Sequence, residues 1–428
     1  MKKKIKIGLM GFGVIGSQVA QTLISKQREL GEMVGTPIEL TKIKVAPVDM
    51  TKPLVAAIGQ ELFTTEEDEF FASDLNVVIE VIGGELPALN YLTRALQNGC
   101  HVVTSNKEVL AKNLAKLVSL ATQKQVSLRA EASVGGGIPL LLPLQEGLTA
   151  NKIQGISAII NGTSNYILSR MRSEDIGYEE CLKDAQLLGY AEANPENDVE
   201  GFDAAYKLSI MASLAFGITV MPSEVYCEGI TKLAQADFTY AADMGYVIRL
   251  LAIAKQTSLG ISVRVHPAFV PQDSILAKVD GVYNAVLFSG DLVGPVMFMG
   301  QGAGAMATTS AVIGDVVNAC IDFQNQTHNT NRWPIRHQKK LVNIEQIETR
   351  YYLRMLIADK PGVLASVAKC LGDNQISIAS AIQHQSGNDA EVVMMTHLAT
   401  EASLRKAIAE LQKINSVNKI CNVIRVEE

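Results

Sequence analysis

The chain has 428 residues, enough for two or three domains, and its 48% hydrophobic and 19% charged residues are typical of a soluble globular protein. A formal net charge of −6 argues against nucleic acid or an anionic membrane as the main partner. The six cysteines are scattered without CxxC or CxH spacing, which indicates reduced thiols in a cytoplasmic protein rather than disulfides or a zinc site. No apolar run is long enough to span a bilayer.

The first motif lies close to the N-terminus. Residues 4–10 predict a short buried strand, residues 17–26 predict a helix, and between them stand Gly11-Phe12-Gly13-Val14-Ile15-Gly16. A GxGxxG motif alone is weak, but strand, glycines and helix in this order predict a dinucleotide-binding turn with the pyrophosphate at the helix N-terminus. The basic and apolar start imitates a signal peptide. The glycine spacing explains it better, since no cleavage-site pattern follows.

The end of the second strand, predicted over residues 38–46, should decide between NAD and NADP. An acid there binds the ribose hydroxyls of NAD, and a base binds the 2′-phosphate of NADP. The segment is Val45-Ala46-Pro47-Val48-Asp49-Met50-Thr51-Lys52. It leaves the choice of cofactor unsettled, with Lys52 the nearest cation for a 2′-phosphate.

Two further strands, over residues 75–84 and 100–104, flank a helix over residues 86–97. The second strand ends in Thr104-Ser105-Asn106-Lys107. Ligands of open α/β sheets bind at the carboxyl ends of strands, so Thr104, Ser105 and Lys107 are candidate cofactor contacts. An exposed loop lysine is the ordinary alternative. Cys100 begins this strand and is expected in the core.

The middle of the chain has three turns of interest. A strand over residues 128–138 enters Gly135–Gly137, which indicates either phosphate contact or a tight domain-crossing turn. A strand over residues 153–160 runs into Asn161-Gly162-Thr163-Ser164-Asn165, whose hydroxyls and amides could meet a substrate carboxylate or cap a helix at Thr163 or Ser164. A third turn, residues 299–308 with Gly302, opens a helix over residues 310–320 that we expect to pack on the first domain near the cofactor. Strands over residues 261–269, 283–289 and 293–299 predict a mixed sheet.

The most informative stretch is residues 185–207. Four acidic residues lie close together, followed by a helix that is apolar on nearly every face and carries Asp203 and Lys207 four positions apart. A surface ion pair worth a few tenths of a kcal/mol is the ordinary interpretation. Charges on an apolar helix are costly unless paired or used, and a buried lysine with a lowered pKa suits proton donation near neutral pH. The four acids are Glu192, Asp198, Glu200 and Asp203.

The run Ala185-x3-Gly189-Tyr190-Ala191-x2-Asn194-Pro195-x2-Asp198-Val199-x-Gly201-x-Asp203-x3-Lys207 resembles the signature of homoserine dehydrogenases. The resemblance extends over nearly all of residues 4–325. It implies that Lys207 and Lys107 are catalytic. It also implies that Glu192 holds the substrate ammonium group, that Asp198 and Asp203 fix the hydroxyl end and Lys207, and that Gly162 and Thr163 meet the carboxylate.

The same resemblance implies two further features. A monovalent cation, Na⁺ or K⁺, would be bound by the backbone carbonyls of Glu131, Val134, Gly136 and Ile138. Many family members carry an arginine about where Val48 stands, so its absence here predicts no more than a modest preference for NADP. No fused aspartate kinase is expected.

The C-terminal part begins with a polar segment, residues 326–349, interpreted as a linker that contains the only tryptophan and a solvated basic cluster at 336–340. From residue 350 the pattern is βαββαβ, which is ferredoxin-like, with a turn at Ser386-Gly387-Asn388. Its Asp359-Lys360-Pro361-Gly362 turn resembles an ACT domain, a small module that binds amino acids. The alternative is a plain dimerisation module.

The sequence thus predicts an α/β protein with a Rossmann-type NAD(P)-binding domain (1–130, completed by about 300–325), an α+β substrate and dimerisation domain (131–325), and an ACT-like domain (350–428). The expected protein is a cytoplasmic homodimer or homotetramer that reduces L-aspartate 4-semialdehyde to L-homoserine with NAD(P)H, with L-threonine as an effector. A semialdehyde dehydrogenase would need a catalytic cysteine. A non-catalytic sensor of nucleotides and amino acids would not need Lys107 and Lys207.

Overall fold

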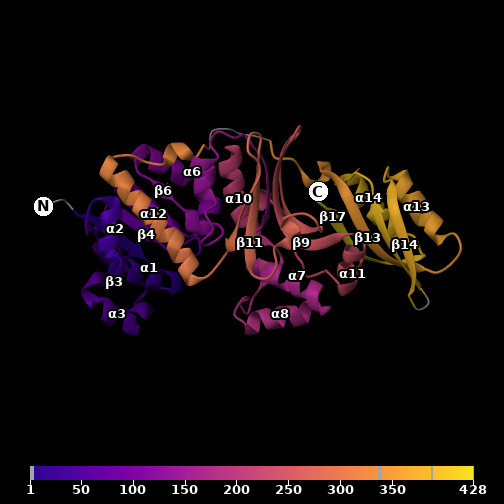
Figure 1. The fold of residues 1–428 in the computed structure, drawn as a ribbon, viewed down its shortest axis with the longest axis horizontal. Helices are drawn as coiled ribbons and strands as arrows, with labels where there is room; N and C mark the ends of the chain where they lie inside the picture. Colours follow the sequence, from indigo (N-terminus) through magenta and orange to yellow (C-terminus); the bar gives the residue numbers. More distant parts are fainter. Residues whose placement is uncertain (1–3, 335–339, 387–388, 428) are drawn as a thin grey trace. The chain divides into compact units, whose positions relative to one another are not determined.

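The computed structural model describes residues 4–334, 340–386 and 389–427. The chain forms two compact units that gather segments distant in sequence, with Met1–Gln154, Tyr206–Glu224 and Phe288–Gln338 in the first (Figure 1). The second contains Gly155–Ala205, Val225–Leu287 and Lys339–Glu428. The predicted boundaries at 130, 325 and 349 instead follow the order of the chain. Among the described helices, none is long and apolar enough to cross a membrane.

The first unit contains a six-stranded sheet in the order β3-β2-β1-β4-β5-β6, with every strand pair parallel. This is the strand order of a doubly wound dinucleotide fold, so the Rossmann prediction is confirmed. The strands are β1 (Ile5–Met10), β2 (Ile38–Lys44), β3 (Phe63–Thr64), β4 (Val77–Glu80), β5 (His101–Thr104) and β6 (Leu128–Arg129). The helices between them are α1 (Val14–Ser25), α2 (Gln27–Val34), α3 (Pro53–Ile58), α4 (Glu67–Phe71), α5 (Ala88–Gln97) and α6 (Lys107–Lys124).

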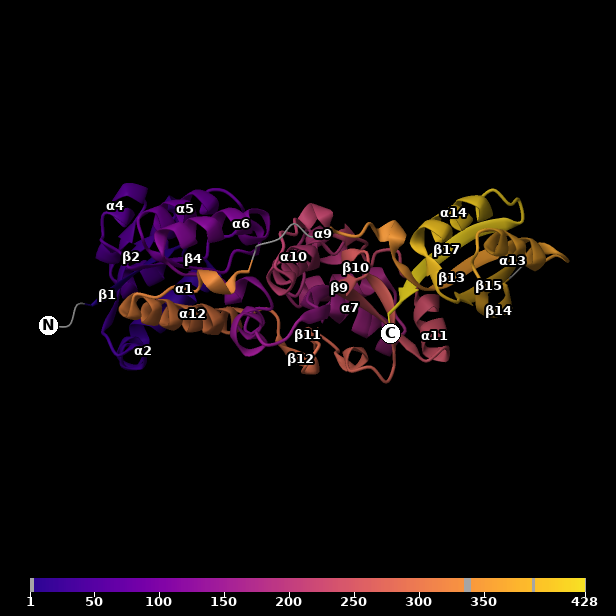
Figure 2. The same ribbon diagram turned by 90° about the horizontal axis from the view of Figure 1, so that it is seen from above.

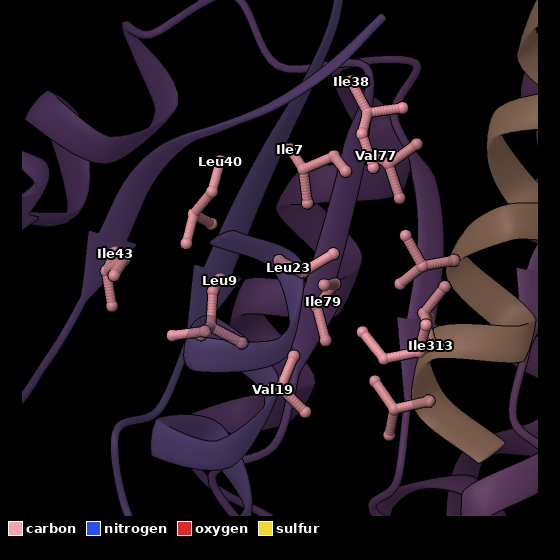
Figure 3. Close-up of a cluster of buried hydrophobic side chains, with 14 of the residues drawn as sticks. Ile7, Leu9, Val19, Leu23, Ile38, Leu40, Ile43, Val77, Ile79 and Ile313 are labelled. Carbon is pink, nitrogen blue, oxygen red and sulfur yellow. The ribbon is translucent and has the colours of Figure 1, made fainter. Parts of the chain in front are cut away.

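Helix α12 (Ala305–Asn325) returns from far along the chain to cover this sheet. Its apolar side, including Val312, Ile313 and Val316, is buried with Leu9 and Ile79 of the central strands in one hydrophobic cluster. Figure 3 shows Ile313 pointing toward side chains of the sheet and of α1. Burial of this apolar surface, which comes from the first 132 residues and from α12, stabilises the sheet that presents the glycine turn.

One predicted strand of the first unit is much shorter than expected. The pattern over residues 128–138 predicts a strand, but β6 ends at Arg129 and a 3₁₀ turn follows over Glu131–Ser133. Gly135 and Gly136 then take positive φ values of 71° and 59°, so extended pairing is lost. The apolar composition that suggested a strand is explained by burial, since Val134 and Ile138 lie in the core.

The second unit is built on a mixed sheet in which β11 (Tyr283–Gly290), β7 (Ile153–Ile159), β9 (Tyr246–Thr257) and β10 (Gly260–Pro271) are neighbours. β9 and β10 form a hairpin paired from Tyr246↔Pro271 to Thr257↔Gly260. The sequence pattern did not predict β9, because its residues 247–254 are all buried and no polar alternation marks them. The helices of this part are α7 (Gly162–Glu174), α8 (Tyr178–Leu187), α9 (Glu196–Val199) and α11 (Gln235–Asp243), and α10 (Phe202–Phe216) continues into the first unit.

The C-terminal residues form the predicted βαββαβ arrangement (Figure 2). Helices α13 and α14 share a hydrophobic core with one face of β13, through Tyr351, Leu353 and Met355. The ferredoxin-like prediction is therefore confirmed. The elements are β13 (Glu348–Ala358), α13 (Val363–Asp373), β14 (Ile378–Ser386), β15 (Asp389–Thr396), β16 (Ala399–Thr400), α14 (Glu401–Leu411) and β17 (Val417–Val426).

This C-terminal part does not stand apart from the middle of the chain. β17 pairs in parallel with β10 at Ala268↔Arg425 and Phe269↔Val426, so the sheet continues as β10-β17-β13-β15-β14. On the other face of β13, Arg354 Nε and the hydroxyl of Tyr352 donate to the fully buried carboxylate of Asp237 in α11, at 2.7 and 3.1 Å. Two polar contacts and a strand pair therefore fix the C-terminal part to its neighbours.

Part of the segment interpreted as a linker is also hydrogen-bonded to the rest of the protein. Trp333 is buried and donates from Nε1 to the carbonyl of Leu128 at 3.0 Å, and Asn329 donates to the same carbonyl at 2.9 Å. Farther along, Val342 N donates to Ile261 O. The predicted basic cluster lies outside the described residues except for Lys340, and Gly387 and Asn388 of the predicted turn lie outside them too.

Candidate active site

The three glycines after β1 have three different structural roles. Gly11 has φ +100°, and a Cβ on it would lie 2.9 Å from Val81 O. A Cβ on Gly16 would lie 2.1 Å from Gly11 O, so only glycine allows α1 to pack this closely. Gly13 is exposed at the start of α1 with open space where its Cβ would be, and Phe12, Val14 and Ile15 complete the turn. The open position is the one at which a pyrophosphate approaches the backbone, so the turn fits a dinucleotide.

The predicted cation after β2 lies at this glycine turn. Lys52 Nζ donates to Phe12 O at 2.8 Å and forms an ion pair with Asp49 at 2.7 Å. Val48, where the resemblance expects arginine, is 75% exposed. The segment after β2 therefore places one cation, Lys52, and one carboxylate, Asp49, at the nucleotide turn. The cation would attract a 2′-phosphate there, and the carboxylate would repel it.

A buried polar cluster joins the ends of β4 and β5. Glu80 accepts hydrogen bonds from the hydroxyl of Thr104 at 2.6 Å and from Ile82 N at 2.7 Å. Burial raises the pKa of the Glu80 carboxyl above its ordinary value. Asn106 caps α6 by accepting from Val109 N at 3.1 Å and donates to Gly84 O at 2.7 Å. These contacts fix the turn that presents Ser105 and Lys107, both half-buried at the start of α6.

The loop after β6 is closed by the side chain of Glu131, whose carboxylate accepts from the backbone N–H groups of Leu140, Leu141 and Leu142. Glu131 N donates to Asp315 of α12 at 2.8 Å. Burial, together with the nearby carboxylate of Glu131, raises the pKa of Asp315 to about 7. The Glu131 side chain thus shapes this loop, whereas the cation prediction concerns its backbone oxygens.

The glycines of this loop lie against the second glycine turn. A Cβ on Gly136 would lie 2.7 Å from the carbonyl oxygen of Gly302, and one on Gly137 would lie 2.9 Å from Ala307 O. Close backbone packing therefore accounts for these glycines. Because Gly135 and Gly136 both have positive φ, successive carbonyls turn sharply, and Ile138 N bonds back to Gly135 O at 3.0 Å.

In the second unit, the side chain of Asn161 joins two of the predicted substrate residues. Its amide nitrogen donates to Asp198 Oδ1 at 2.7 Å and to Asp203 Oδ2 at 2.9 Å. Its amide oxygen accepts from Ser164 N at 2.8 Å, so Asn161 is also the N-cap of α7. The predicted cap at Thr163 or Ser164 is wrong by two or three positions. One side chain thus sets the spacing of two carboxylates and the start of a helix.

The other residues of this turn support the same arrangement. Thr163 is buried and donates from its hydroxyl to Tyr190 O at 2.6 Å, so its side chain holds the signature loop. A Cβ on Gly162 would lie 2.9 Å from Val282 O. Gly162 and Thr163 are the first two residues of α7, whose backbone N–H groups have no acceptor within the helix. Such groups suit a carboxylate.

The signature residues differ in burial. Asp203 is only 4% exposed, Asp198 and Lys207 are half-buried, and Glu192 is exposed. Asp203 and Lys207 occupy α10 one turn apart, and the apolar residues between and after them, such as Leu208 and Met211, are fully buried. The prediction of a buried helix with two charges near its start is confirmed.

The cysteines do not have the surroundings of nucleophiles. Burial raises the pKa of the Cys100 thiol to about 11 and that of Cys227 to about 12. Cys100 also donates to Leu75 O at 3.2 Å. A thiol with so high a pKa carries little thiolate at neutral pH, which disfavours the thioester chemistry of a semialdehyde dehydrogenase.

Two of the polar residues that organise these sites were not predicted from the sequence. Glu80 was hidden in an apolar strand, and Asn161 was seen only as part of a polar turn. A carboxylate within an otherwise buried strand is costly unless it is hydrogen-bonded, so the composition of β4 was the available signal for Glu80. No local signal connects Asn161 with acids that follow it by about forty residues.

The parallel sheet with its glycine turn, the clustered carboxylates of the mixed-sheet part and the lysine of α10 together define a dinucleotide-dependent oxidoreductase. Three family models match the chain: the NAD-binding domain of homoserine dehydrogenase at residues 11–131, homoserine dehydrogenase at 139–317, and the ACT domain at 351–415. The chain belongs to the homoserine dehydrogenase family.

Relatives align over the full length of the chain. Homoserine dehydrogenase of a Synechocystis strain is 40% identical, and that of Neisseria gonorrhoeae 38%, each over 99% of both chains. The crystal structure of a homoserine dehydrogenase from Thiobacillus denitrificans is 37% identical and superposes with a TM-score of 0.93 over both complete chains. The NAD(P)-dependent oxidoreductase activity expected from the sequence is therefore shown by family and by fold.

Proposed function

We propose that the protein catalyses the reversible NAD(P)H-dependent reduction of L-aspartate 4-semialdehyde to L-homoserine, in the biosynthesis of threonine, methionine and isoleucine. The observation that carries this proposal for the present chain is the Asn161 bridge. It holds Asp198 and Asp203 together at the start of α7, and Lys207 follows Asp203 by one helical turn. These side chains can bind a hydroxyl group and deliver a proton to it.

The bound nicotinamide cofactor supplies a hydride to the aldehyde carbon. Lys207, helped by Lys107, donates a proton to the oxygen of that carbonyl, so that the hydride and the proton together give the alcohol. Asp198 and Asp203 orient the hydroxyl end and Lys207. Glu192 binds the substrate ammonium group, while the first N–H groups of α7, at Gly162 and Thr163, bind the carboxylate.

The cofactor is held by the glycine turn and by the segment after β5. Open space at Gly13 and the close approach at Gly16 fit a pyrophosphate beside α1. Thr104, Ser105 and Gly302 contribute to the same site. NADP is preferred only modestly, because Lys52, the cation available to a 2′-phosphate, also forms an ion pair with Asp49. One homologous structure, a hyperthermophilic archaeal enzyme 26% identical over 74% of this chain, is a complex with NADPH.

A monovalent cation, with Na⁺ the first choice, is bound by the backbone carbonyls of Glu131, Val134, Gly136 and Ile138. Carbonyl oxygens suit such a hard ion. The consecutive positive φ values at Gly135 and Gly136 curve the backbone tightly, which supports a loop whose carbonyls converge on one point. The protein works as a homodimer or homotetramer in the cytoplasm, with L-threonine as the effector of the ACT domain.

The direct test is purified protein with L-aspartate 4-semialdehyde and NADPH, followed by absorbance at the nicotinamide band. Turnover to L-homoserine supports the proposal. A preparation that binds nucleotide and amino acid but does not oxidise NADPH would instead establish the alternative, a non-catalytic sensing protein. In a separate assay of the semialdehyde with NADP⁺ and inorganic phosphate, formation of an acyl phosphate and NADPH would indicate a semialdehyde dehydrogenase.

A further inference from the structure

The short junction between α9 and α10 separates two of the predicted substrate residues, Asp198 in α9 and Asp203 in α10. It consists of Glu200 and Gly201, and Gly201 has a positive φ of 84°. The path of the backbone through these two residues sets where each helix lies, and with it the positions of the two carboxylates. Contacts that hold the junction therefore bear on the substrate site.

One segment of the second unit, residues 226–231, is hydrogen-bonded to this junction. Ile230 N donates to Val199 O, at the end of α9, at 2.8 Å. The hydroxyl of Thr231 donates to Glu200 Oε1 at 2.9 Å. One backbone bond and one side-chain bond thus join the segment to the last residue of α9 and to the residue that follows it.

The same two pieces of backbone are packed closely together. A Cβ on Gly229 would lie 2.5 Å from Val199 O, and one on Gly201 would lie 3.1 Å from Cys227 Sγ. The thiol of Cys227 also donates to Glu200 O at 3.2 Å. Because there is no space between the segment and the junction, a shift of one must move the other.

The side chain of Glu228 connects this segment to the last strand of the chain. Arg425 of β17 donates to Glu228 Oε2 at 2.7 Å, and the hydroxyl of Tyr226 donates to the same oxygen at 3.0 Å. Arg425 is only 6% exposed, and two bonds to Glu401 of α14, at 2.6 and 2.9 Å, fix it from the other side. A guanidinium that is buried and held in this way is a rigid anchor for Glu228.

The segment has little other support on the side of Glu228. A cavity of about 440 Å³ lies there, and its lining includes Glu228, Gly229 and Arg405. The Glu228 side chain is 30% exposed. Glu228 N donates to Val265 O of β10 at 2.9 Å, so the backbone is anchored to the sheet before the segment turns toward α9. Beyond that bond, the position of the segment depends on the side-chain contact with Arg425.

We propose that Arg425, acting through Glu228, positions the junction between α9 and α10 and thereby Asp198 and Asp203. The inference rests on the proposed function, which assigns these two carboxylates to the substrate. Arg425 touches neither of them, so it is a positioning residue. The last strand of the chain then supports the substrate site in addition to stabilising the sheet.

The test is Glu228→Ala in the full-length protein, and the chain offers a matched control. Glu391 of β15 likewise accepts from a buried arginine, Arg354, at 3.0 Å and from a tyrosine hydroxyl, that of Tyr240, at 2.8 Å. Arg354 also has a second carboxylate partner, Asp237. Glu391→Ala therefore removes the same kinds of bond, but at a place where the partners lead to α11 and not to the junction.

We expect Glu228→Ala to lower kcat/KM for L-aspartate 4-semialdehyde about tenfold, which is about 1.4 kcal/mol, and to leave the Kd of NADPH unchanged. Glu391→Ala should change kcat/KM by less than about twofold, although both variants should lower the melting temperature similarly. Glu228→Gln keeps an oxygen that accepts from Arg425 and should recover most of the lost activity. Amide hydrogen exchange at Ile230, measured by mass spectrometry, should be faster in Glu228→Ala than in Glu391→Ala, because this N–H donates to Val199.

Equal kcat/KM in Glu228→Ala and Glu391→Ala would overturn the proposal and leave the ion pair of Arg425 with a stabilising role alone. Equal exchange at Ile230 would overturn it as well, because the segment would then not depend on Glu228. If circular dichroism shows that Glu228→Ala does not fold, Glu228→Asp, which shortens the side chain by one methylene, takes its place with the same expectations. If the wild type does not reduce the semialdehyde, the proposed function has failed, and the exchange comparison alone decides whether Arg425 positions the junction.

Discussion

Asn161 and Asp203 stand 42 residues apart in the chain, yet the amide nitrogen of Asn161 lies 2.9 Å from a carboxylate oxygen of Asp203. The same nitrogen lies 2.7 Å from Asp198. Two carboxylates held on one donor would repel each other without it. This bridge links the polar turn after β7 to the signature sequence, and it is the first feature that mutation should address.

Asn161→Ala should lower kcat/KM for aspartate semialdehyde at least about tenfold, because the two carboxylates lose their shared donor. It should also lower the free energy of unfolding by about 1–3 kcal/mol, from the lost N-cap of α7 and the buried carboxylate of Asp203 left with fewer partners. Steady-state kinetics and urea unfolding measure the two effects. Thr400→Ala is the matched control, since Thr400 caps α14 by accepting from Ser403 N. It should cost stability alone, and equal kinetics in both variants would contradict the role of the bridge.

Lys207→Ala should lower kcat by roughly 10²–10⁴ while leaving the Kd of the cofactor nearly unchanged, because the lysine acts on the substrate oxygen. Fluorescence titration with NADPH and turnover assays separate the two quantities. Lys183→Ala, at an exposed position of α8, is the control and should keep full activity. If Lys207→Ala has the kcat of the wild type, the role of Lys207 is structural and not catalytic.

Cofactor choice should respond in opposite directions to the ion pair after β2. Lys52→Ala should reduce kcat/KM for NADPH about tenfold and that for NADH much less, since only NADPH carries the 2′-phosphate. Asp49→Asn should increase the preference for NADPH by removing a competing anion. The wild type should favour neither cofactor more than about a thousandfold, near 4 kcal/mol. A larger ratio would show that another residue selects the cofactor.

Stability should fall in mild acid partly through His101. Burial lowers its pKa to about 4 in the folded protein, against an ordinary value of 6.5, and its ring nitrogen accepts from Ser127 N. The unfolded chain therefore binds the proton more readily. The contribution is fully present above pH 6.5 and is lost as the pH falls toward 4, by about 3 kcal/mol at most. Urea unfolding of His101→Gln between pH 4 and 7 should show a shallower decline than the wild type. Parallel curves would assign the decline to other groups.

Deletion of residues from 350 onward should destabilise the protein rather than leave a fully active core. The sequence suggested a separable tail, but truncation removes Arg354 and Tyr352 from the buried Asp237 and β17 from β10. Removing one partner of a buried ion pair costs about 3–5 kcal/mol. Arg354→Ala keeps the chain intact, and it should lower the melting temperature nearly as much as truncation of a large side chain in the hydrophobic core would. If the truncated protein has the melting temperature of the full-length protein, the C-terminal part is separable, as its sequence suggested.

The sequence alone determined the features that depend on backbone geometry within a short stretch. The glycine turn is one, since Gly11 has a positive φ of +100° and Gly16 packs against the carbonyl of Gly11, five residues before it. The signature and the order of the C-terminal elements are others. These patterns are local, because helix and strand periods and glycine conformations are written over a few neighbouring residues.

Tertiary structure decided which distant groups meet. The apolar composition of β9 and the polar composition of residues 326–349 gave no sign that the first lies in the middle of a sheet or that Trp333 of the second is buried. Likewise, the residues next to Asp237 and Asn161 in the sequence do not indicate which distant side chains bind to them. Ion pairs and hydrogen bonds form wherever packing of the apolar faces brings side chains together, and that packing depends on the whole chain.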